Sequence, residues 1–243
     1  MDWPPHCVAV IPCFNEAERI GAVITGVQSH LPNVIVVDDG STDATAACAR
    51  RAGAEVLSQP RNRGKGAALQ TGWQRARERG FTWVLMLDGD GQHAPADIPK
   101  LFARAESSHA RLVIGNRMNH ADCMPWLRRQ VNRSMSRRLS RLTGVPLPDS
   151  QCGFRLAHLP TLLALPIRAN RFEIESAMLV AFFRAGARVD FVPVQTIYQN
   201  EHSNINPLTD TIRWLRWRFA PGGFRQRRSA IPSCGNVPSS TRT

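Results

Sequence analysis

The sequence is short of acidic residues and of paired cysteines, and each shortage excludes a class of protein. It has 19 Asp and Glu against 31 Lys and Arg, which gives a formal net charge of +12. Its partners are therefore expected to be anionic, such as phosphates, nucleic acid or an acidic membrane surface. The six cysteines include no CxxC pair and no His/Cys cluster with the spacing of a structural zinc site. We expect reduced thiols in a cytoplasmic protein.

Two membrane signals are also missing. The first residues, MDWPPHC, have no charged segment followed by an apolar one as in a secretory signal, and no stretch approaches the roughly 18 uninterrupted apolar residues of a spanning helix. Membrane contact is therefore expected to be peripheral, at the cytoplasmic face. A chain of 243 residues with 43% hydrophobic content is ordinary for one globular domain.

Short apolar runs alternate with segments of helical period through the first half. Strands are predicted at CVAVIPC, NVIVVDDG, AEVLSQ, TWVLMLD and RLVIGNR, and helices over 16–28, 42–52, 64–79 and 96–105. Continuously apolar strands between helices predict an α/β fold with a mostly parallel sheet covered on both faces.

Beyond residue 119 the alternation stops. A basic helical stretch that begins PWLRR is followed by a turn at PLPDSQCGFR, an apolar helix over 172–185, a strand or two in RVDFVPVQTIY and a short helix over 210–219. The basic tail, 220–243, has too little apolar content to pack and is expected to be disordered.

Polar motifs follow four of the predicted strands. PCFNE comes after the first strand, DDGSTD after the second, DGDGQH after the fourth and GNR after the fifth. In an open α/β sheet, ligands bind beyond the carboxyl ends of the strands. These four loops are therefore expected to share one rim and to form a site.

The DGDGQH loop indicates a metal site. Asp88 and Asp90 offer hard oxygen ligands of the kind that Mg²⁺ or Mn²⁺ prefers, and Gln92 adds a third oxygen. A calcium-binding EF-hand is excluded because His93 and Pro99 stand where its glycine and glutamate belong. The alternative is a solvated turn, but the buried run VLML and the interleaved glycines favour the metal.

Two further loops offer donor contacts. Asp38 and Asp39 end the second strand, where carboxylates are well placed for ribose hydroxyls or a base edge, while the residues after them fit helix capping. NRGKGAAL is not a Walker motif, since Gln59 and Gly66 replace required residues. Lys65 is a candidate diphosphate contact, and the equal alternative is that the two glycines simply permit close backbone approach.

Four charged residues of the second half are candidates for acid/base catalysis or for contacts with the acceptor. Asp149 and Arg155 lie in DSQCGFR, and Glu173 and Glu175 in RFEIES. For Glu175, a carboxylate that simply favours a helix N-terminus is an equal alternative.

Together these motifs resemble family-2 glycosyltransferases with the GT-A fold, most of all the branch with dolichyl-phosphate mannose synthase and bacterial polyprenyl-phosphate glycosyltransferases. The resemblance implies one GT-A domain over 7–219. A nucleotide-sugar-binding half with a Rossmann-like sheet would span 7–118, and a smaller acceptor-side half 119–219. The sequence departs from the family at Asn204, where relatives often have histidine; His202 lies two residues earlier.

The resemblance also implies roles for individual residues. Asp90 and Asp149 would be catalytic, and Asp88, Asp90 and Gln92 would hold Mg²⁺ or Mn²⁺. The donor would contact Pro12, Asn15, Glu16, Asp38, Asp39, Lys65, Asp88 and Gly89. The acceptor would contact Arg117, Arg133, Gln151, Arg155 and Glu173.

The expected reaction is inverting transfer of a sugar from a UDP- or GDP-sugar to a polyprenyl or dolichyl phosphate. Such a phosphate, with a second pKa of about 6, needs hardly any base, whereas a hydroxyl acceptor would need Asp149 as the base. Arginines alternating with apolar residues over 128–142, and RWLRWRF at 213–219, favour helices at a membrane interface. For the first helix, packing of the apolar stripe on the protein's own core with the arginines in water is an equal alternative.

Other functions stay open at this point. One is transfer to a hydroxyl acceptor. Another is sugar-phosphate nucleotidyl transfer, although PCFNEAERIG stands where its glycine-rich loop is expected. A third is a non-enzymatic basic module, which explains the charge but not the four loops. No nucleic-acid partner is expected.

Overall fold

The structure is a computed structural model that describes residues 1–119, 124–167 and 169–197. Predictions on Asn204, on the helix over 210–219 and on the tail 220–243 lie outside the described residues.

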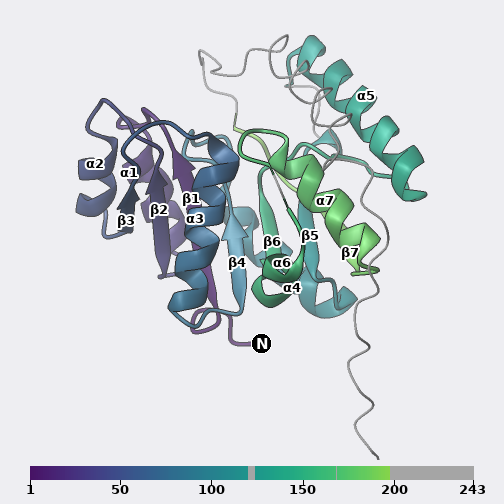
Figure 1. The fold of residues 1–243 in the computed structure, drawn as a ribbon, viewed down its shortest axis with the longest axis horizontal. Coiled ribbons are helices and arrows are strands. Elements are labelled where there is room, and N and C mark those ends of the chain that lie inside the picture. The colour runs from purple at the N-terminus through teal and green to yellow at the C-terminus, as the bar shows by residue number, and fades with distance from the viewer. Residues whose placement is uncertain (120–123, 168, 198–243) are drawn as a thin grey trace, which may run out of the picture.

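A seven-stranded sheet in the order β3-β2-β1-β4-β6-β5-β7 forms the centre of the molecule (Figure 1). All neighbouring strands are parallel except β6, which runs antiparallel to both β4 and β5. The strands are β1 (Cys7–Cys13), β2 (Val34–Asp38), β3 (Glu55–Ser58), β4 (Trp83–Met86), β5 (Leu112–Asn116), β6 (Arg155–His158) and β7 (Val189–Pro193).

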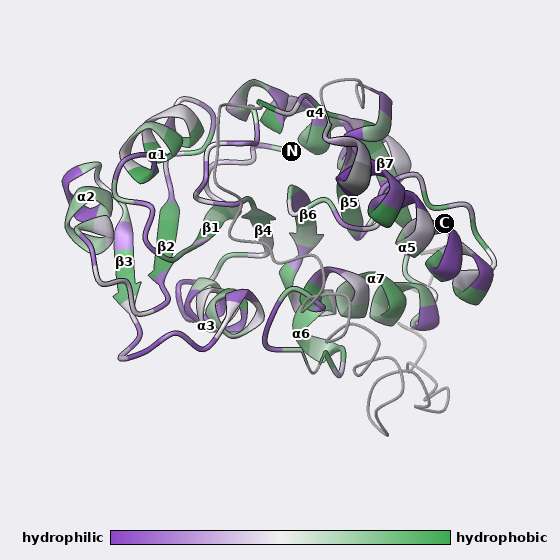
Figure 2. Ribbon diagram, turned by 90° about the horizontal axis from the view of Figure 1, so that it is seen from above, coloured by the Kyte–Doolittle hydropathy of each residue, from purple (hydrophilic) through white to green (hydrophobic). Residues whose placement is uncertain are grey.

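Helices cover both faces of this sheet (Figure 2). One face carries α1 (Ile20–Gln28) and α4 (Ile98–Ser108), which follows the 3-10 turn η1 (Pro95–Asp97). The other face carries α3 (Lys65–Glu78), α6 (Leu159–Ala164) and α7 (Ile174–Arg184). α2 (Thr45–Arg51) lies beside β3, and α5 (Trp126–Thr143) packs against α7 at the far end of the molecule.

Burial follows the predicted pattern. Every residue of β2, β4 and β5 is buried, as expected for strands between two helical layers. Strand β6 was not predicted, because it has only four residues and contains the buried Arg155 in place of a continuous apolar run. Its insertion between β4 and β5 joins the two predicted halves in one sheet.

A glycine allows α3 to lie close to the sheet. A Cβ added at Gly72 would come 2.3 Å from Val10 Cγ1 and 3.3 Å from Val37 Cγ2. We expect Gly72→Ala to lower the free energy of unfolding by about 1–3 kcal/mol, because the helix must shift away from β1. Urea denaturation measures this change.

The matched control is Gly21→Ala in α1, where an added Cβ meets nothing within 4 Å. Alanine is the better helix former, so this variant should gain about 0.5–1 kcal/mol. Equal losses in both variants would contradict the close packing of α3 on β1.

Candidate active site

The loops after β1 and β2 are joined by hydrogen bonds to side chains. Asn15, which has a φ of 55°, accepts the backbone N–H of Thr42 on Oδ1 at 2.9 Å. Its own N–H donates to Ser41 Oγ at 2.9 Å, and the N–H of Glu16 donates to Thr45 Oγ1 at 2.8 Å. The two predicted donor-binding loops therefore form one rigid wall of the rim.

The two carboxylates after β2 shape the same wall. Asp39 is 3% exposed, and its two oxygens accept the backbone N–H groups of Arg63 and Gly64 at 2.8 and 2.7 Å. Asp38 accepts the N–H of Ser41 at 3.0 Å. Asp39 thus holds the loop before α3 against the end of β2.

A partly buried lysine connects three elements at the centre of the site. Lys65 Nζ, at the start of α3, lies 2.6 Å from Asp88 Oδ1 and 2.6 Å from Glu175 Oε1 at the start of α7. Gly153 covers this group, since an added Cβ would come 2.7 Å from Asp88 Oδ2 and 2.9 Å from Lys65 Nζ. Pro12 lies beside the same group. We call Lys65, Asp88 and Glu175 the ion-pair triad.

Burial and the neighbouring charges shift the pKa values of Lys65 and Asp88 in opposite directions. Burial alone would lower the pKa of Lys65, but the carboxylates of Asp88 and Glu175 raise it above its usual value. Burial would raise the pKa of Asp88, but the Lys65 ammonium and the neighbouring His93 lower it well below its usual range. Lys65 and Asp88 are therefore both charged near neutral pH.

The loop after β4 places a second carboxylate beside the first. Asp90 Oδ1 accepts the N–H of Gln92 at 3.0 Å, and both burial and the charge of Asp88 raise the pKa of Asp90. Gly89 packs on β1, where an added Cβ would come 2.5 Å from Cys13 Sγ. Among the described residues, no three His, Cys, Asp or Glu side chains gather into a complete metal site by themselves.

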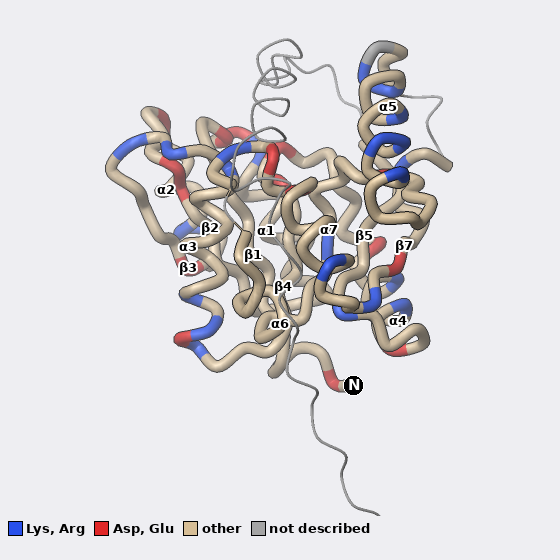
Figure 3. The backbone as a smooth tube through the Cα atoms, turned by 45° about the vertical axis from the view of Figure 1, so that its right-hand side comes forward, with Lys and Arg blue, Asp and Glu red and all other residues tan. Residues whose placement is uncertain are grey.

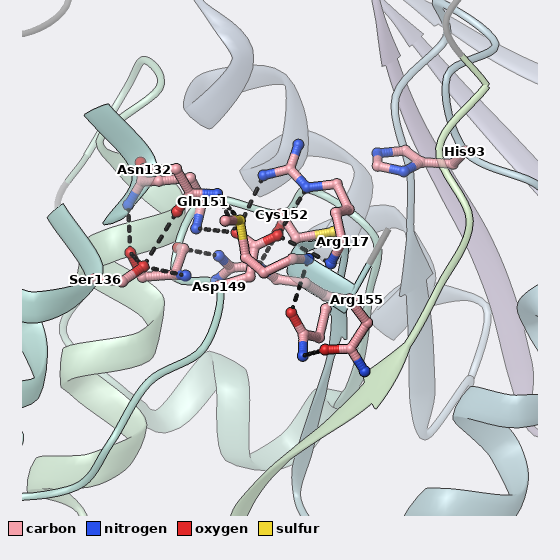
Figure 4. A network of polar contacts seen from close by, with 12 residues as sticks. His93, Arg117, Asn132, Ser136, Asp149, Gln151, Cys152 and Arg155 are labelled. Carbon is pink, nitrogen blue, oxygen red and sulfur yellow. Dashed lines mark hydrogen bonds and ion pairs between the residues drawn. The ribbon is translucent and has the colours of Figure 1, made fainter. Parts of the chain in front are cut away.

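Asp149, predicted to lie on the acceptor side, is fully buried. It is the centre of a network of polar contacts (Figure 4). The Arg117 guanidinium donates to its two oxygens at 2.8 and 3.1 Å, and the Arg117 N–H donates at 3.2 Å. Asn132 Nδ2 and the Gln151 N–H add bonds of 2.9 and 3.1 Å. Burial would raise the pKa of Asp149, but Arg117 lowers it below its usual value. Asp149 therefore orients Arg117 and is poorly suited to accept a proton.

Arg155 also differs from its expected role. It is 1% exposed, and its guanidinium donates to the backbone carbonyls of Cys152, Glu175 and Ser150 at 2.7, 2.7 and 2.9 Å. A guanidinium buried among these carbonyls fixes the turn before β6 and the start of α7, and it does not reach an acceptor.

The remaining predicted acceptor residues lie around this turn. Gln151 Nε2 donates to Ser150 Oγ and Ser176 Oγ at 2.9 and 3.1 Å. Glu173 precedes α7 and accepts the Arg171 N–H at 3.3 Å, while Arg133 is exposed on α5. The structure thus brings Gln151 close to Asp149 and leaves Arg133 on the outer face.

Sequence reasoning gave no role to Gly153 or His93. Gly153 contacts a carboxylate 65 positions earlier in the chain, and no local pattern signals such a contact. His93 directly follows Gln92, the last of the predicted metal ligands, and is 5% exposed. Its Nε2 lies 3.5 Å from Asp88 Oδ2. Its position after two acidic residues was the one available signal.

Removing the Lys65 ammonium should reverse the contribution that Asp88 makes to the pH dependence of stability. In the wild type the lowered pKa of Asp88 stabilises the fold above the unfolded-state pKa of about 4, and this contribution is lost as pH falls. In Lys65→Met the carboxylates of Asp88 and Glu175 lose their shared ammonium, so the pKa of Asp88 rises and its protonation relieves the repulsion between the two groups. We expect a loss of about 1–3 kcal/mol near pH 7 that shrinks towards pH 5, less than for a fully buried pair because solvent reaches Asp88.

Urea denaturation between pH 5 and 8 measures this loss. The control is Arg79→Met, which removes a more exposed ion pair with Glu55, 2.6 Å long. It should cause a small loss, because such pairs are screened by solvent. A Lys65→Met loss that grows as pH falls would contradict the charged triad.

Comparison with known proteins gives consistent similarities. A sequence profile described as "Glycosyl transferase family 2" matches residues 8–160. The chain is 30% identical over 212 residues to UDP-N-acetylglucosamine–dolichyl-phosphate N-acetylglucosaminyltransferase of Methanococcus voltae, covering 78% of this chain and 84% of that protein. It is 35% identical over 159 residues to dodecaprenyl-phosphate galacturonate synthase of Rhizobium johnstonii, covering 60% and 46%.

The fold is similar to a solved structure of glucosyl-3-phosphoglycerate synthase from Mycobacterium tuberculosis in complex with Mn²⁺, UDP and phosphoglyceric acid. The TM-score is 0.69 with 23% sequence identity, and the match covers 87% of this chain and 75% of that chain. At this level of identity the likeness concerns the fold.

Proposed function

The chain belongs to glycosyltransferase family 2, and on that premise we propose that it transfers a sugar from a UDP- or GDP-sugar to a polyprenyl or dolichyl phosphate with the help of Mg²⁺ or Mn²⁺. The observation that carries this proposal is the pair Asp88 and Asp90 at the end of β4. It lies beside the partly buried Lys65, on the sheet edge where β1 and β2 also end.

The proposed class of sugar donor is supported by the loops after β1 and β2 and by the similar proteins. The loops after β1 and β2 form a rigid wall, of which Asn15, Glu16 and Asp38 are part. The M. voltae relative is named for a UDP-sugar donor, and the similar solved structure holds UDP with Mn²⁺. A nucleoside diphosphate bound at this wall would direct its diphosphate towards the end of β4.

The charges at the end of β4 fit a divalent cation. Asp88, Asp90 and Glu175 supply three carboxylates against the single ammonium of Lys65, and the pKa of Asp90 is raised by burial and by its neighbour's charge. A cation held by Asp88, Asp90 and Gln92 would relieve this repulsion, with diphosphate oxygens and water completing the shell. When bound, it would supply charge neutralisation for the diphosphate that leaves.

The protein's own side chains would position the reactants. Lys65 and Gly153 fix the direction of Asp88, and Asp149 fixes the guanidinium of Arg117 at the end of β5. Arg117 would then face the acceptor phosphate as a preoriented cation, which costs less ordering on binding than a free side chain. The acceptor would attack the sugar from the side opposite the diphosphate, which inverts the anomeric centre.

The state of Asp149 supports a phosphate acceptor over a hydroxyl. A hydroxyl nucleophile needs a base, but Asp149, the candidate base, is fully buried, accepts bonds from Arg117, Asn132 and Gln151, and has a lowered pKa. A phosphate monoester is already largely dianionic at neutral pH. Two relatives are named for dolichyl-phosphate and dodecaprenyl-phosphate chemistry.

Helix α5 supports contact with a membrane surface. Arg133, Arg137 and Arg141 are exposed along it, and Trp126 at its start is 66% exposed. Figure 3 shows that Lys and Arg positions recur along α5. The apolar residues predicted to face the membrane do not all do so, since Leu139 is buried against the protein. None of the described helices combines the length and apolar character that crossing a membrane requires. Peripheral binding at the cytoplasmic face remains the proposal.

Nucleotide binding tests the proposed site. Wild-type protein should bind UDP or GDP more tightly with Mn²⁺ than without it in calorimetric titration. Asp90→Asn should remove the gain from Mn²⁺ and lower turnover by more than about 100-fold, because one charge of the metal pair is lost. The control Asp190→Asn changes a β7 carboxylate that lies 3.8 Å from Arg104, and it should leave both properties intact. Full activity in Asp90→Asn would remove Asp90 from the mechanism.

Vesicle binding tests the role of α5. The triple variant Arg133→Gln, Arg137→Gln, Arg141→Gln should bind vesicles containing anionic lipid at least tenfold more weakly, at about 1 kcal/mol for each arginine near the surface. A control with the exposed Arg51, Arg61 and Arg77 changed to Gln loses the same charge elsewhere. Equal weakening of the two variants in a sedimentation assay would indicate general charge attraction and contradict docking through α5.

A further inference from the structure

His93 is buried beside Asp88, yet half of its hydrogen-bonding capacity is unused. Its Nε2 lies 3.5 Å from Asp88 Oδ2, and its ring centroid lies 5.2 Å from that of Phe154. Nδ1 is buried and finds no hydrogen-bond partner among the described residues. Figure 4 shows the ring to one side of the Asp149 network, with no dashed line to it. An unpaired buried polar atom is destabilising, so its presence requires an explanation.

Thr196 has the complementary unpaired group. His93 and Thr196 form an antiparallel bridge, and the N–H of Ile197 donates to the Gln92 carbonyl at 2.9 Å beside it. Opposite side chains of such a bridge lie on the same face, with Cβ atoms about 4.5–5.5 Å apart. Thr196 Oγ1 is also buried, and no described residue bonds to it. A hydroxyl donor and an imidazole acceptor therefore stand next to each other unpaired.

The segment that carries Thr196 is anchored on both sides. Val194 N–H donates to the Asn116 carbonyl at 3.1 Å, and Gln195 N–H donates to Asp97 Oδ2 at 2.6 Å. The segment 194–197 thus joins the end of β5, the start of α4 and the loop of Gln92. A movement of the loop that carries Gln92 and His93 against this anchored segment would decide whether the Thr196 hydroxyl reaches His93 Nδ1, because a hydrogen bond depends steeply on distance and angle.

We propose that Thr196, His93 and Asp88 form a positioning chain that closes when a nucleoside diphosphate and its metal bind. Thr196 Oγ1–H then donates to His93 Nδ1, which fixes the tautomer in which Nε2–H donates to Asp88 Oδ2. Lys65 already holds Oδ1 at 2.6 Å, so the closed chain fixes both oxygens of Asp88 and the plane of its carboxylate. His93 and Thr196 are positioning residues, and the inference rests on the proposed function.

The chain offers a matched control, because a second Thr–His pair is already closed in the structure. His158 Nδ1 lies 2.8 Å from Thr161 Oγ1, at the end of β6 that pairs with Trp83 at the start of β4. This is the opposite end of β4 from Asp88. Thr161→Val therefore removes a formed bond away from the site, whereas Thr196→Val removes a hydroxyl that is unpaired in the absence of ligand.

The experiment compares wild type, Thr196→Val, Thr196→Ser and Thr161→Val by calorimetric titration with UDP and GDP in the presence of Mn²⁺, and by thermal unfolding without nucleotide. We expect Thr196→Val to bind the nucleotide about five- to tenfold more weakly, while its nucleotide-free Tm stays equal or rises. Thr196→Ser keeps the hydroxyl and should restore binding. Thr161→Val should show the reverse, a lower Tm and unchanged binding.

Each other outcome has a distinct meaning. Failure of the wild type to bind either nucleotide contradicts the proposed function and this inference with it. If the wild type and Thr196→Val bind the nucleotide equally well, the inference alone is overturned. This result is expected if a water molecule bridges the two unpaired atoms. Equal weakening by Thr196→Ser, or a lower nucleotide-free Tm in Thr196→Val, also overturns it, because the effect would then not come from a hydroxyl that pairs only on binding.

Discussion

The ammonium of Lys65 is the interaction on which the arrangement of the site depends. It binds Asp88 at the end of β4 and Glu175 at the start of α7, each at 2.6 Å, and so joins the first and second halves of the chain. Two carboxylates this close would repel each other without a shared cation. The position of α7 relative to the loop of Asp88 and Asp90 is therefore set by charge as well as by apolar packing.

Glycines provide the room for this group. Gly153 lies over Asp88 and Lys65, where an added Cβ would come within 3 Å of both side chains. At Gly66, next to Lys65, an added Cβ would come 2.4 Å from the Ala169 carbonyl. The glycines of NRGKG thus serve close contact between α3 and the chain before α7. The half-match of this segment to a phosphate-binding loop has a structural explanation that needs no phosphate.

The α/β fold and the GT-A assignment could be predicted from the sequence, and both are confirmed by the sheet and by the comparisons. Apolar periodicity is a local signal, so the parallel strands and their helices were found in order. Strand β6 was missed because it is short and contains Arg155. The triad was missed because it joins positions 65, 88 and 175, and no spacing in the chain reports a contact between them.

Two carboxylate sites in this chain differ in how completely their charge is neutralised: Asp149 is fully buried, whereas Asp88 and Asp90 are partly buried. Asp149 has a bidentate arginine, an amide and a backbone donor, so its charge is fully compensated and a further ligand has little to add. Lys65 is shared by Asp88 and Glu175, whereas Asp90 accepts the Gln92 N–H, and burial and the charge of Asp88 raise the pKa of Asp90. The Asp149 site is therefore complete without a ligand, and the cation that we propose is assigned to the loop of Asp88 and Asp90.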